Sequence, residues 1–244
     1  MEPREYYDEK PELNRRLNEG DGIRNTHNFI KARLIERFMP TRSHILDLGC
    51  GQGGDLLKYR RKRLKSYRGI DVSHTAIERN NERIVSINLR CRCKLECIDF
   101  CSRKWHTPNA HDVVSCQFAL QYAFQSETMA RNVIGQAATS LKDGGIFLGT
   151  IPVHESAPSF TQVQVKLPDD DRECLEYVAD HKDIKRLCEE FKLEEILFDN
   201  FQGFYAKERA TAAGLAIRMR ALSPPDRHNA VFVYRKQPET ITLD

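Results

Sequence analysis

A short apolar run that passes directly into a glycine-rich turn constrains this sequence more than any other feature. Residues 44–48 (HILDL) have the composition of a buried strand, and the turn GCGQGG (49–54) follows at once. A helix pattern starts at Gly54. A strand, a glycine turn and a helix in this order bring backbone N–H groups close to a ligand at the helix N-terminus. The pattern predicts an α/β fold with a ligand site after this strand.

Strand and helix patterns alternate from this point to about residue 151. Further strands are expected at 67–72, 93–98, 112–116 and 146–151, and helices at 28–38, 75–88 and 126–141. In each helix the apolar residues recur at the spacing of one helical face. Strands separated by helices predict right-handed crossovers and a parallel sheet covered by helices on both faces.

The alternation of strand and helix patterns ends after Pro152. Residues 152–176 are expected to form an inserted loop or hairpin, and a helix at 181–191 and strands at 193–199 and 230–234 follow. A terminal pair of strands, one of them antiparallel, would complete the sheet. The expected fold class is therefore α/β, with a doubly wound, mostly parallel, seven-stranded Rossmann-like sheet.

The composition agrees with one domain over residues 1–244, in which 1–22 form a charged N-terminal arm. The chain is 40% hydrophobic with a formal net charge of +3, which suits a single α/β core. No apolar run reaches the roughly 18 residues of a membrane span. The polar start also lacks the apolar core of a secretory signal, so we expect no membrane attachment.

Four of the eight cysteines lie close together, at positions 91, 93, 97 and 101. Their spacing, C-x-C-x3-C-x3-C, differs from the spacings of zinc fingers and ribbons. The segment also alternates like a strand. Buried thiols in a reducing compartment are therefore favoured over a metal site.

Two carboxylates flank the glycine turn, Asp47 before it and Asp55 after it. A dinucleotide-binding turn is the competing interpretation, but these carboxylates would repel a pyrophosphate. They suit the sulfonium and ammonium groups of S-adenosylmethionine. Asp71 and Asp99 end the next two strands, where one can accept both ribose hydroxyls and the other an adenine amino proton. The alternative for such strand-end aspartates is that they cap helices.

Four stretches of the chain resemble the mRNA cap guanine-N7 methyltransferase family. They are RNTHNFIKARLI (24–35), LDLGCGQGGDLLKY (46–59), SCQFALQYAF (115–124) and CLEYVAD (174–180), and FDNFQGFY (198–205) follows. The resemblance implies methyl transfer from S-adenosylmethionine to N7 of the guanosine cap of mRNA, with S-adenosylhomocysteine as product. It also implies capped RNA (a 5′ GpppN end) as substrate, other capping enzymes or RNA polymerase as partners, a monomer, and a nuclear location, or a cytoplasmic one if the chain is viral.

The resemblance also assigns roles to individual positions. The implied cofactor-binding residues are Lys31, Gly49, Asp55, Asp71, Asp99, Gln117 and Tyr122. The implied substrate-binding residues are His27, Asn28, Gln52, Arg83, Phe118, Gln121 and Glu176. Glu176 and Tyr122 are the implied catalytic residues. One carboxylate can accept both the N1–H and the N2 amino group of guanine, and Glu176 would stabilise the charge that develops on methylation.

The acceptor side departs from the family pattern at several positions. Gln52 stands where the family has Lys, His27 where it has Asn, and Gln121 where it has His, and no tyrosine lies near Asn229. These changes lower positive charge and aromatic stacking. A divergent cap enzyme, a small-molecule heterocycle N-methyltransferase derived from one, and a catalytically silent RNA-binding subunit therefore all remain open.

Residues 58–68 (KYRRKRLKSYR) place seven basic residues around two tyrosines. Such a segment can contact an RNA backbone or the 5′ triphosphate. It can equally serve as a nuclear import signal, or form a solvated helix face and turn.

Overall fold

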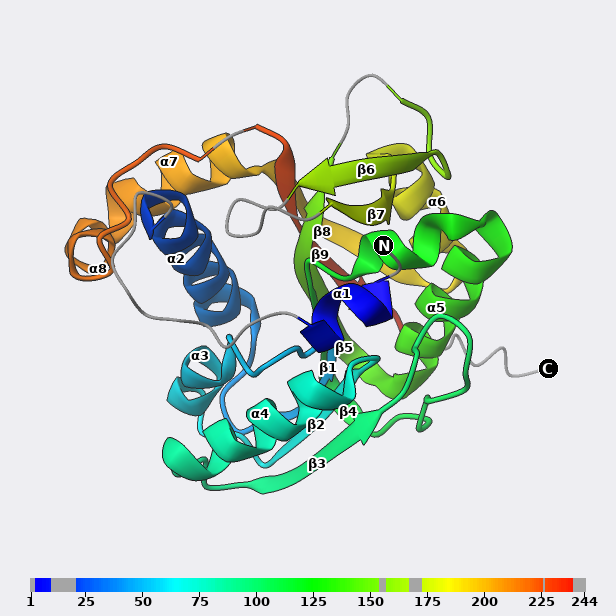
Figure 1. Ribbon diagram of the computed structural model, residues 1–244, viewed down its shortest axis with the longest axis horizontal. Helices are drawn as coiled ribbons and strands as arrows, with labels where there is room; N and C mark the ends of the chain where they lie inside the picture. Colours follow the sequence, from blue (N-terminus) through cyan, green and yellow to red (C-terminus); the bar gives the residue numbers. More distant parts are fainter. Residues whose placement is uncertain (1–2, 10–20, 154–156, 167–172, 226, 239–244) are drawn as a thin grey trace.

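A seven-stranded sheet forms the centre of the molecule (Figure 1). The computed structural model describes residues 3–9, 21–153, 157–166, 173–225 and 227–238. The strand order is β3-β2-β1-β4-β5-β9-β8. The strands are β1 His44–Leu48, β2 Ser66–Asp71, β3 Arg92–Cys97, β4 His111–Gln117, β5 Leu141–Pro152, β8 Leu193–Asn200 and β9 Asn229–Lys236. Only β9 runs against its neighbours, so the predicted mostly parallel, seven-stranded sheet is confirmed.

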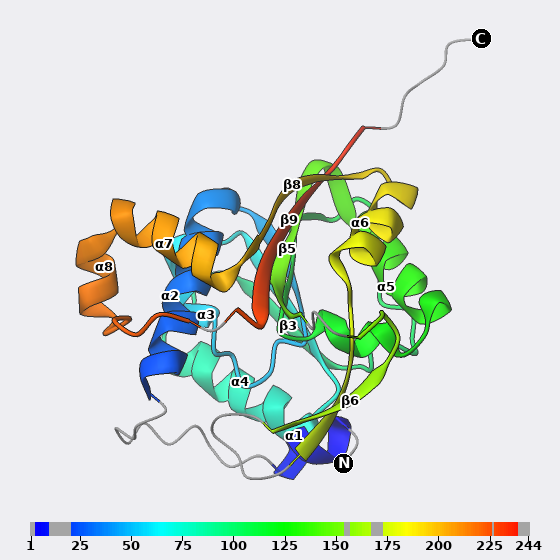
Figure 2. The same ribbon diagram turned by 90° about the horizontal axis from the view of Figure 1, so that it is seen from above.

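Helices cover both faces of this sheet, as Figure 2 shows. On one face lie α2 (Asp21–Phe38), α3 (Leu56–Arg61), α4 (His74–Ser86), α7 (Phe201–Thr211) and α8 (Ala213–Arg218). On the other lie α5 (Glu127–Ser140) and α6 (His181–Glu190). Alternate residues of β1 serve the two cores, because Ile45 packs on the α2 side and Leu46 on the α5 side. None of the described helices is long and apolar enough to cross a bilayer.

The helices α7 and α8 were not expected from the sequence, and α2 is longer than expected. The strand β8 passes directly into α7, where the Asn200 side chain accepts a hydrogen bond from the Gly203 N–H at 2.8 Å. Phe201, Phe204 and Tyr205 then bury one helical face. The N-cap and this spacing are readable signals for α7. The helix α2 begins at Asp21, seven residues before the expected start.

Two small elements lie at the carboxyl edge of the sheet. Within the insertion, β6 (Gln162–Lys166) and β7 (Glu173–Tyr177) pair antiparallel as a separate sheet. Near the chain start, α1 (Pro3–Glu9) contacts α4 and β7, and its Tyr6 is fully buried. The Ser73 hydroxyl donates to Asp8 Oδ1 at 2.6 Å, which ties α1 to the start of α4.

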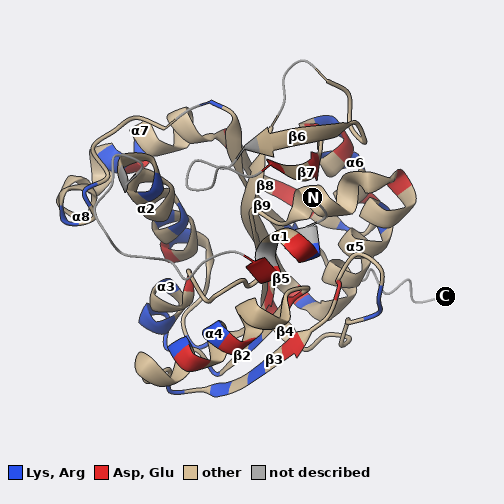
Figure 3. Cartoon of the chain, in the orientation of Figure 1, with Lys and Arg blue, Asp and Glu red and all other residues tan. Residues whose placement is uncertain are grey.

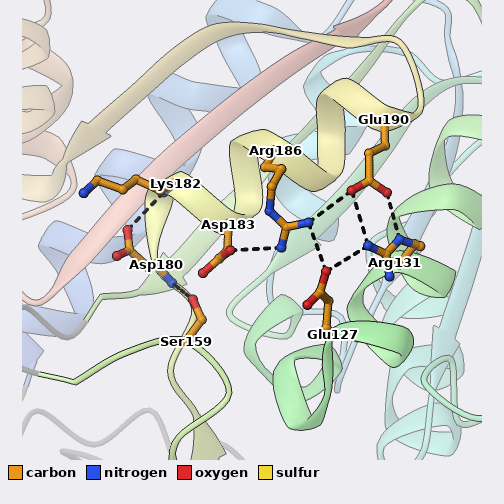
Figure 4. A network of polar contacts seen from close by, with 8 residues as sticks. All are labelled: Glu127, Arg131, Ser159, Asp180, Lys182, Asp183, Arg186 and Glu190. Atoms are coloured by element: carbon orange, nitrogen blue, oxygen red, sulfur yellow. Dashed lines mark hydrogen bonds and ion pairs between the residues drawn. The ribbon is translucent and has the colours of Figure 1, made fainter.

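An exposed ion network joins α5 to α6 (Figure 4). Arg131 and Arg186 each contact both Glu127 and Glu190, and Arg186 also contacts Asp183. Single exposed ion pairs contribute little to stability, but shared partners restrict both helices together. The network therefore fixes α6 against α5 on the face of the sheet opposite α2.

Candidate active site

A cleft of about 600 Å³ opens at the carboxyl ends of β1, β2 and β4. This is the place where the strand order changes direction, and parallel sheets bind ligands there. Its volume suits a ligand of nucleoside size. Ten predicted site residues line it: Lys31, Gly49, Gln52, Asp55, Asp71, Arg83, Asp99, Gln117, Phe118 and Tyr122. Arg4 of α1 and Tyr177 of β7 also line it and were not predicted.

The glycine turn brings its backbone to the cleft in conformations that other residues rarely adopt. Gly49, Gly51 and Gly53 have φ of 67°, 49° and 74°. The N–H of Gly49 donates to the Ile70 carbonyl oxygen at 2.9 Å. A Cβ on Gly49 would lie 2.4 Å from the Ala119 Cβ, whereas a Cβ on Gly51 would meet nothing within 4 Å. Gly49 is therefore required for packing, and Gly51 leaves the backbone open to a ligand.

We expect Gly49→Ala to lower the free energy of unfolding more than Gly51→Ala. Both substitutions incur about 1–2 kcal/mol for a left-handed backbone. Only Gly49→Ala adds overpacking, which costs about 1–3 kcal/mol. Urea unfolding of both variants measures the difference, and Gly49→Ala/Ala119→Gly should recover the packing part. Equal losses in the two single variants would contradict the clash.

Asp71 and Asp99 hold the loops at the ends of β2 and β3. Asp71 accepts the Gly51 N–H at 2.7 Å through Oδ2 and the Ser73 N–H at 3.0 Å through Oδ1. Burial raises the pKa of Asp71 although these backbone bonds oppose the shift. Asp99 accepts the Cys101 N–H at 2.9 Å. The N-cap of α4 is Ser73, not Asp71, so the helix-cap alternative is wrong for Asp71.

Two lysines hold Asp55 at the end of the glycine turn. Lys31 Nζ lies 2.9 Å from Oδ2 and Lys58 Nζ lies 2.5 Å from Oδ1. Burial alone would raise the pKa of Asp55, but the two lysines outweigh it and hold the pKa below its usual range. Two cations around one carboxylate leave a positive excess beside the cleft, which suits a ligand carboxylate. Lys58 was missed, although its spacing from Asp55 along α3 is a signal for such a pair.

Asp47 does not take part in this arrangement, and the expectation that it faces a cationic ligand is wrong. It lies beneath the turn and is 4% exposed. Its two oxygens accept the hydroxyl groups of Tyr59 at 3.0 Å and Tyr67 at 3.1 Å. Burial, with help from the nearby charge of Asp55, raises its pKa to about 7. Asp47 therefore supports the carboxyl end of β1 from a buried position below the candidate site.

A second polar cluster lies beside the cleft, around Glu176 on β7. Glu176 Oε1 accepts the side-chain amide N–H of Gln121 at 3.2 Å and the hydroxyl of Tyr122 at 3.4 Å. Glu176 is 4% exposed and Gln121 is 1% exposed, and burial raises the pKa of Glu176. Among the described residues both bonds end on Oε1, so Oε2 keeps its lone pairs for a ligand. Tyr122 belongs to both the cleft and this cluster.

Aromatic rings form the wall between α2 and the end of β4. The His27 ring lies 5.6 Å from that of Phe118 and 5.1 Å from that of Phe201. Phe118, which lines the cleft, has a φ of 57°, a conformation that strains a non-glycine residue. Asn28 accepts a bond from Lys58 at 2.9 Å. Four predicted site residues are therefore not among those that line the cleft: His27, Asn28, Gln121 and Glu176.

The clustered cysteines are only partly buried. Cys97 is exposed, which contradicts the expectation of buried thiols there, and Cys91, Cys93 and Cys101 are half-buried. Within the described ranges, no group of three or more His, Cys, Asp or Glu side chains is placed to hold a metal ion.

Solved structures share this fold. An S-adenosylmethionine-dependent methyltransferase from Mesorhizobium loti superposes with a TM-score of 0.61 at 12% identity, over 86% of this chain and 98% of that one. Geranyl diphosphate C-methyltransferase from Streptomyces coelicolor, in complex with S-adenosyl-L-homocysteine, gives 0.59 at 13% identity, over 85% and 78%. The fold is therefore that of the S-adenosylmethionine-dependent methyltransferases.

The sequence narrows this class to one family. Residues 3–164 match the model of the mRNA (guanine-N(7))-methyltransferase domain, and the chain belongs to that family. The mRNA cap guanine-N(7) methyltransferase of Candida glabrata is 37% identical over 165 residues, 62% of this chain and 40% of the relative. That of Saccharomyces cerevisiae is 36% identical over 165 residues, 62% and 38%.

These alignments cover only part of this chain and only part of each relative. The chain spans less than half the length of the curated relatives from Candida glabrata, Saccharomyces cerevisiae and Schizosaccharomyces pombe. The family match ends at residue 164. Glu176 and Phe201 lie beyond it, so their roles depend on the geometry described above.

Proposed function

We propose that this chain transfers a methyl group from S-adenosylmethionine to N7 of the guanosine cap of mRNA. The observation that carries the proposal is the position of Tyr122, which lines the donor cleft and donates a hydrogen bond to Glu176. Donor site and acceptor carboxylate are therefore separated by one side chain. Family membership supports the same reaction. Capped mRNA is made in the nucleus, so the proposal extends to a nuclear location.

The residues of the cleft fit S-adenosylmethionine. The open space over Gly51 accommodates a ligand that a Cβ would obstruct. Lys31 would bind the methionine carboxylate, Asp71 the ribose hydroxyls and Asp99 the adenine amino group, while Gln117 and Tyr122 close the site. The site thus has a cationic side chain for the carboxylate end of S-adenosylmethionine and hydrogen-bond acceptors for its nucleoside end. When bound, S-adenosylmethionine supplies an electrophilic methyl group on a sulfonium.

On the acceptor side, the chain has to orient a base and does not have to remove a proton. N7 of guanine carries a lone pair and no proton at neutral pH, so no general base is needed. Glu176 would accept the guanine N1–H and N2 amino protons through its carboxylate and stabilise the positive charge that develops on the ring. Gln121 and Tyr122 hold that carboxylate in place. Orientation of this kind can supply up to about 7–11 kcal/mol.

Incubation with radiolabelled S-adenosylmethionine and GpppA-capped RNA tests the proposal. We expect nuclease digestion to release labelled 7-methylguanosine. Donor binding with no 7-methylguanosine would reject the cap reaction and favour a small-molecule N-methyltransferase. Absence of donor binding by calorimetry would instead favour a catalytically silent RNA-binding subunit.

A further inference from the structure

Six basic residues gather at the amino ends of β1, β2 and β3, the edge of the sheet opposite the cleft. We call them the amino-edge cluster: Arg42, Arg61, Arg63, Lys65, Arg90 and Arg92. The strand register aligns them, because His44 pairs with Ser66 and Ser66 pairs with Arg92. The Arg42 N–H donates to the Lys62 carbonyl at 2.8 Å, which joins the loop before β1 to the loop after α3. Figure 3 shows basic positions on α3 and along the first half of β3.

The structure divides the basic segment 58–68 into two groups. Lys58, Arg60, Lys62 and Arg68 are engaged with the protein through Asp55, the Ile87 carbonyl, the Glu36 carbonyl and Glu96. Arg61, Arg63 and Lys65 are exposed, and their side chains make no hydrogen bond with the described part of the chain. The positive charges of these three side chains are therefore available to bind a partner.

The cluster borders a hollow of about 300 Å³ that Arg42, Lys65 and Lys142 line. Asp112 neutralises Lys142 at 2.7 Å, and Asp143 is the other acid of the hollow. Three cations and two acids line the hollow, and the other four residues of the cluster, which lie at the same edge of the sheet, add to this positive excess. Such a concentrated positive field attracts a polyanion.

The helix α3 connects this cluster to the cleft. Its N-cap is Asp55, which lines the cleft, and its last residue is Arg61. Arg83 of α4 also lines the cleft. The Arg60 guanidinium donates to the Ile87 carbonyl at 2.7 Å and so fixes α3 against the end of α4. Basic residues therefore continue from the cleft to the opposite edge of the sheet.

We propose that the amino-edge cluster binds the RNA chain that follows the cap. The inference rests on the proposed function, because it takes the polyanion to be the substrate that leaves the cleft past Arg83. Contacts of exposed Arg and Lys with phosphates are independent of sequence, as a general mRNA substrate requires. The segment is also helical at Arg60–Arg61 and inside the sheet at Arg68, so its charges form a fixed surface and not an extended peptide.

RNA length decides whether the cluster is reached. The five residues of β1 separate it from the cleft, a distance of roughly 17 Å at the rise of a strand. Single-stranded binding sites of this kind typically cover about 4–16 nucleotides. A capped dinucleotide should therefore not reach the cluster, whereas a capped RNA of about fifteen nucleotides should.

The test compares two double variants with the same change in charge. Arg63→Glu/Arg92→Glu alters the cluster, and Lys182→Glu/Lys185→Glu alters exposed positions on α6. Fluorescence anisotropy measures binding of the longer capped RNA over a range of KCl. We expect the cluster variant to bind at least about 10-fold more weakly and its salt slope to fall by about 1.4, which is about 0.7 for each phosphate that is no longer neutralised. The KM for a GpppG cap analogue should not change.

Three outcomes would overturn the proposal: equal losses in both double variants, an equal loss for GpppG and the longer RNA, or tighter binding of a decaglutamate peptide than of RNA at the same salt. The last outcome would indicate an acidic protein partner. Circular dichroism of both variants shows that they fold. Binding is measured without methyl transfer, so a failure of the cap reaction remains distinguishable from a failure of the RNA surface.

Discussion

Replacing Glu176 by Gln is expected to lower kcat for cap methylation by about 10²–10³-fold, the range seen when one preorganised transition-state interaction is removed. The substitution keeps the size of the side chain and its bonds with Gln121 and Tyr122 can re-form, but the negative charge is lost. S-adenosylmethionine affinity should stay within about twofold, because Glu176 does not line the cleft. Steady-state methylation kinetics and calorimetry measure the two quantities separately.

A neighbouring residue on the same strand provides the control. Glu173 is exposed on β7, so Glu173→Gln removes the same charge without touching the cluster around Glu176 and should leave kcat unchanged. The pH profile adds a second readout. Burial raises the pKa of Glu176, so the active carboxylate is lost at a higher pH than for an ordinary Glu, and kcat/KM should fall as pH is lowered through that pKa. The Glu176→Gln variant should lack this fall of kcat/KM at low pH. If the fall persists in the variant, Glu176 is not the group that titrates.

Replacing Asp71 by Asn is expected to weaken S-adenosylmethionine binding by at least about 100-fold. Two bonds from backbone N–H groups, of Gly51 and Ser73, end on the Asp71 carboxylate, and hydrogen bonds to a charged group contribute about 1.5–3 kcal/mol each. An Asn can accept only one of them and turns its NH₂ group toward the other N–H. The variant is therefore expected to lose the proposed ribose acceptor and the order of the glycine turn together. Calorimetric titration with S-adenosylhomocysteine measures the loss.

Asp112 supplies the matched control for this prediction. It is also a strand aspartate that accepts a backbone N–H, that of His44 at 2.7 Å, but it lies at the amino end of β4. Asp112→Asn should leave donor affinity unchanged. If Asp71→Asn binds donor like the unaltered chain, the carboxylate has no part in the donor site.

The sheet was predictable because its strands carry their own signals, apolar runs that end in Gly or Asp and lead into periodic helices. The same reasoning indicated Asp71 and Asp99, which stand at strand ends, and the glycine turn itself, whereas Lys31 in α2 and Tyr122 after β4 were assigned by the family resemblance. The prediction for Asp47 was wrong because a sequence does not show whether a carboxylate beside a turn faces the ligand site or the protein interior. Two buried hydroxyls, of Tyr59 and Tyr67, draw Asp47 beneath the sheet end.

The acceptor side was less accessible to sequence reasoning because its parts are brought together by tertiary packing alone. Gln121 and Glu176 are 55 positions apart and meet through one hydrogen bond. Phe201 joins His27 and Phe118 from an unexpected helix. Arg4 reaches the cleft from the segment that was expected to form a charged N-terminal arm. Local patterns carry no information about such long-range interactions.

Two of the hydrogen bonds of Ser73 join different parts of the chain. Its backbone N–H binds Asp71, and its hydroxyl binds Asp8. Detachment of α1 would therefore remove a partner from the same residue whose N–H binds the Asp71 carboxylate, and would withdraw Arg4 from the wall of the cleft. We therefore expect binding of S-adenosylmethionine and docking of α1 to be thermodynamically coupled, so that substitutions that detach α1 should increase the dissociation rate of S-adenosylmethionine.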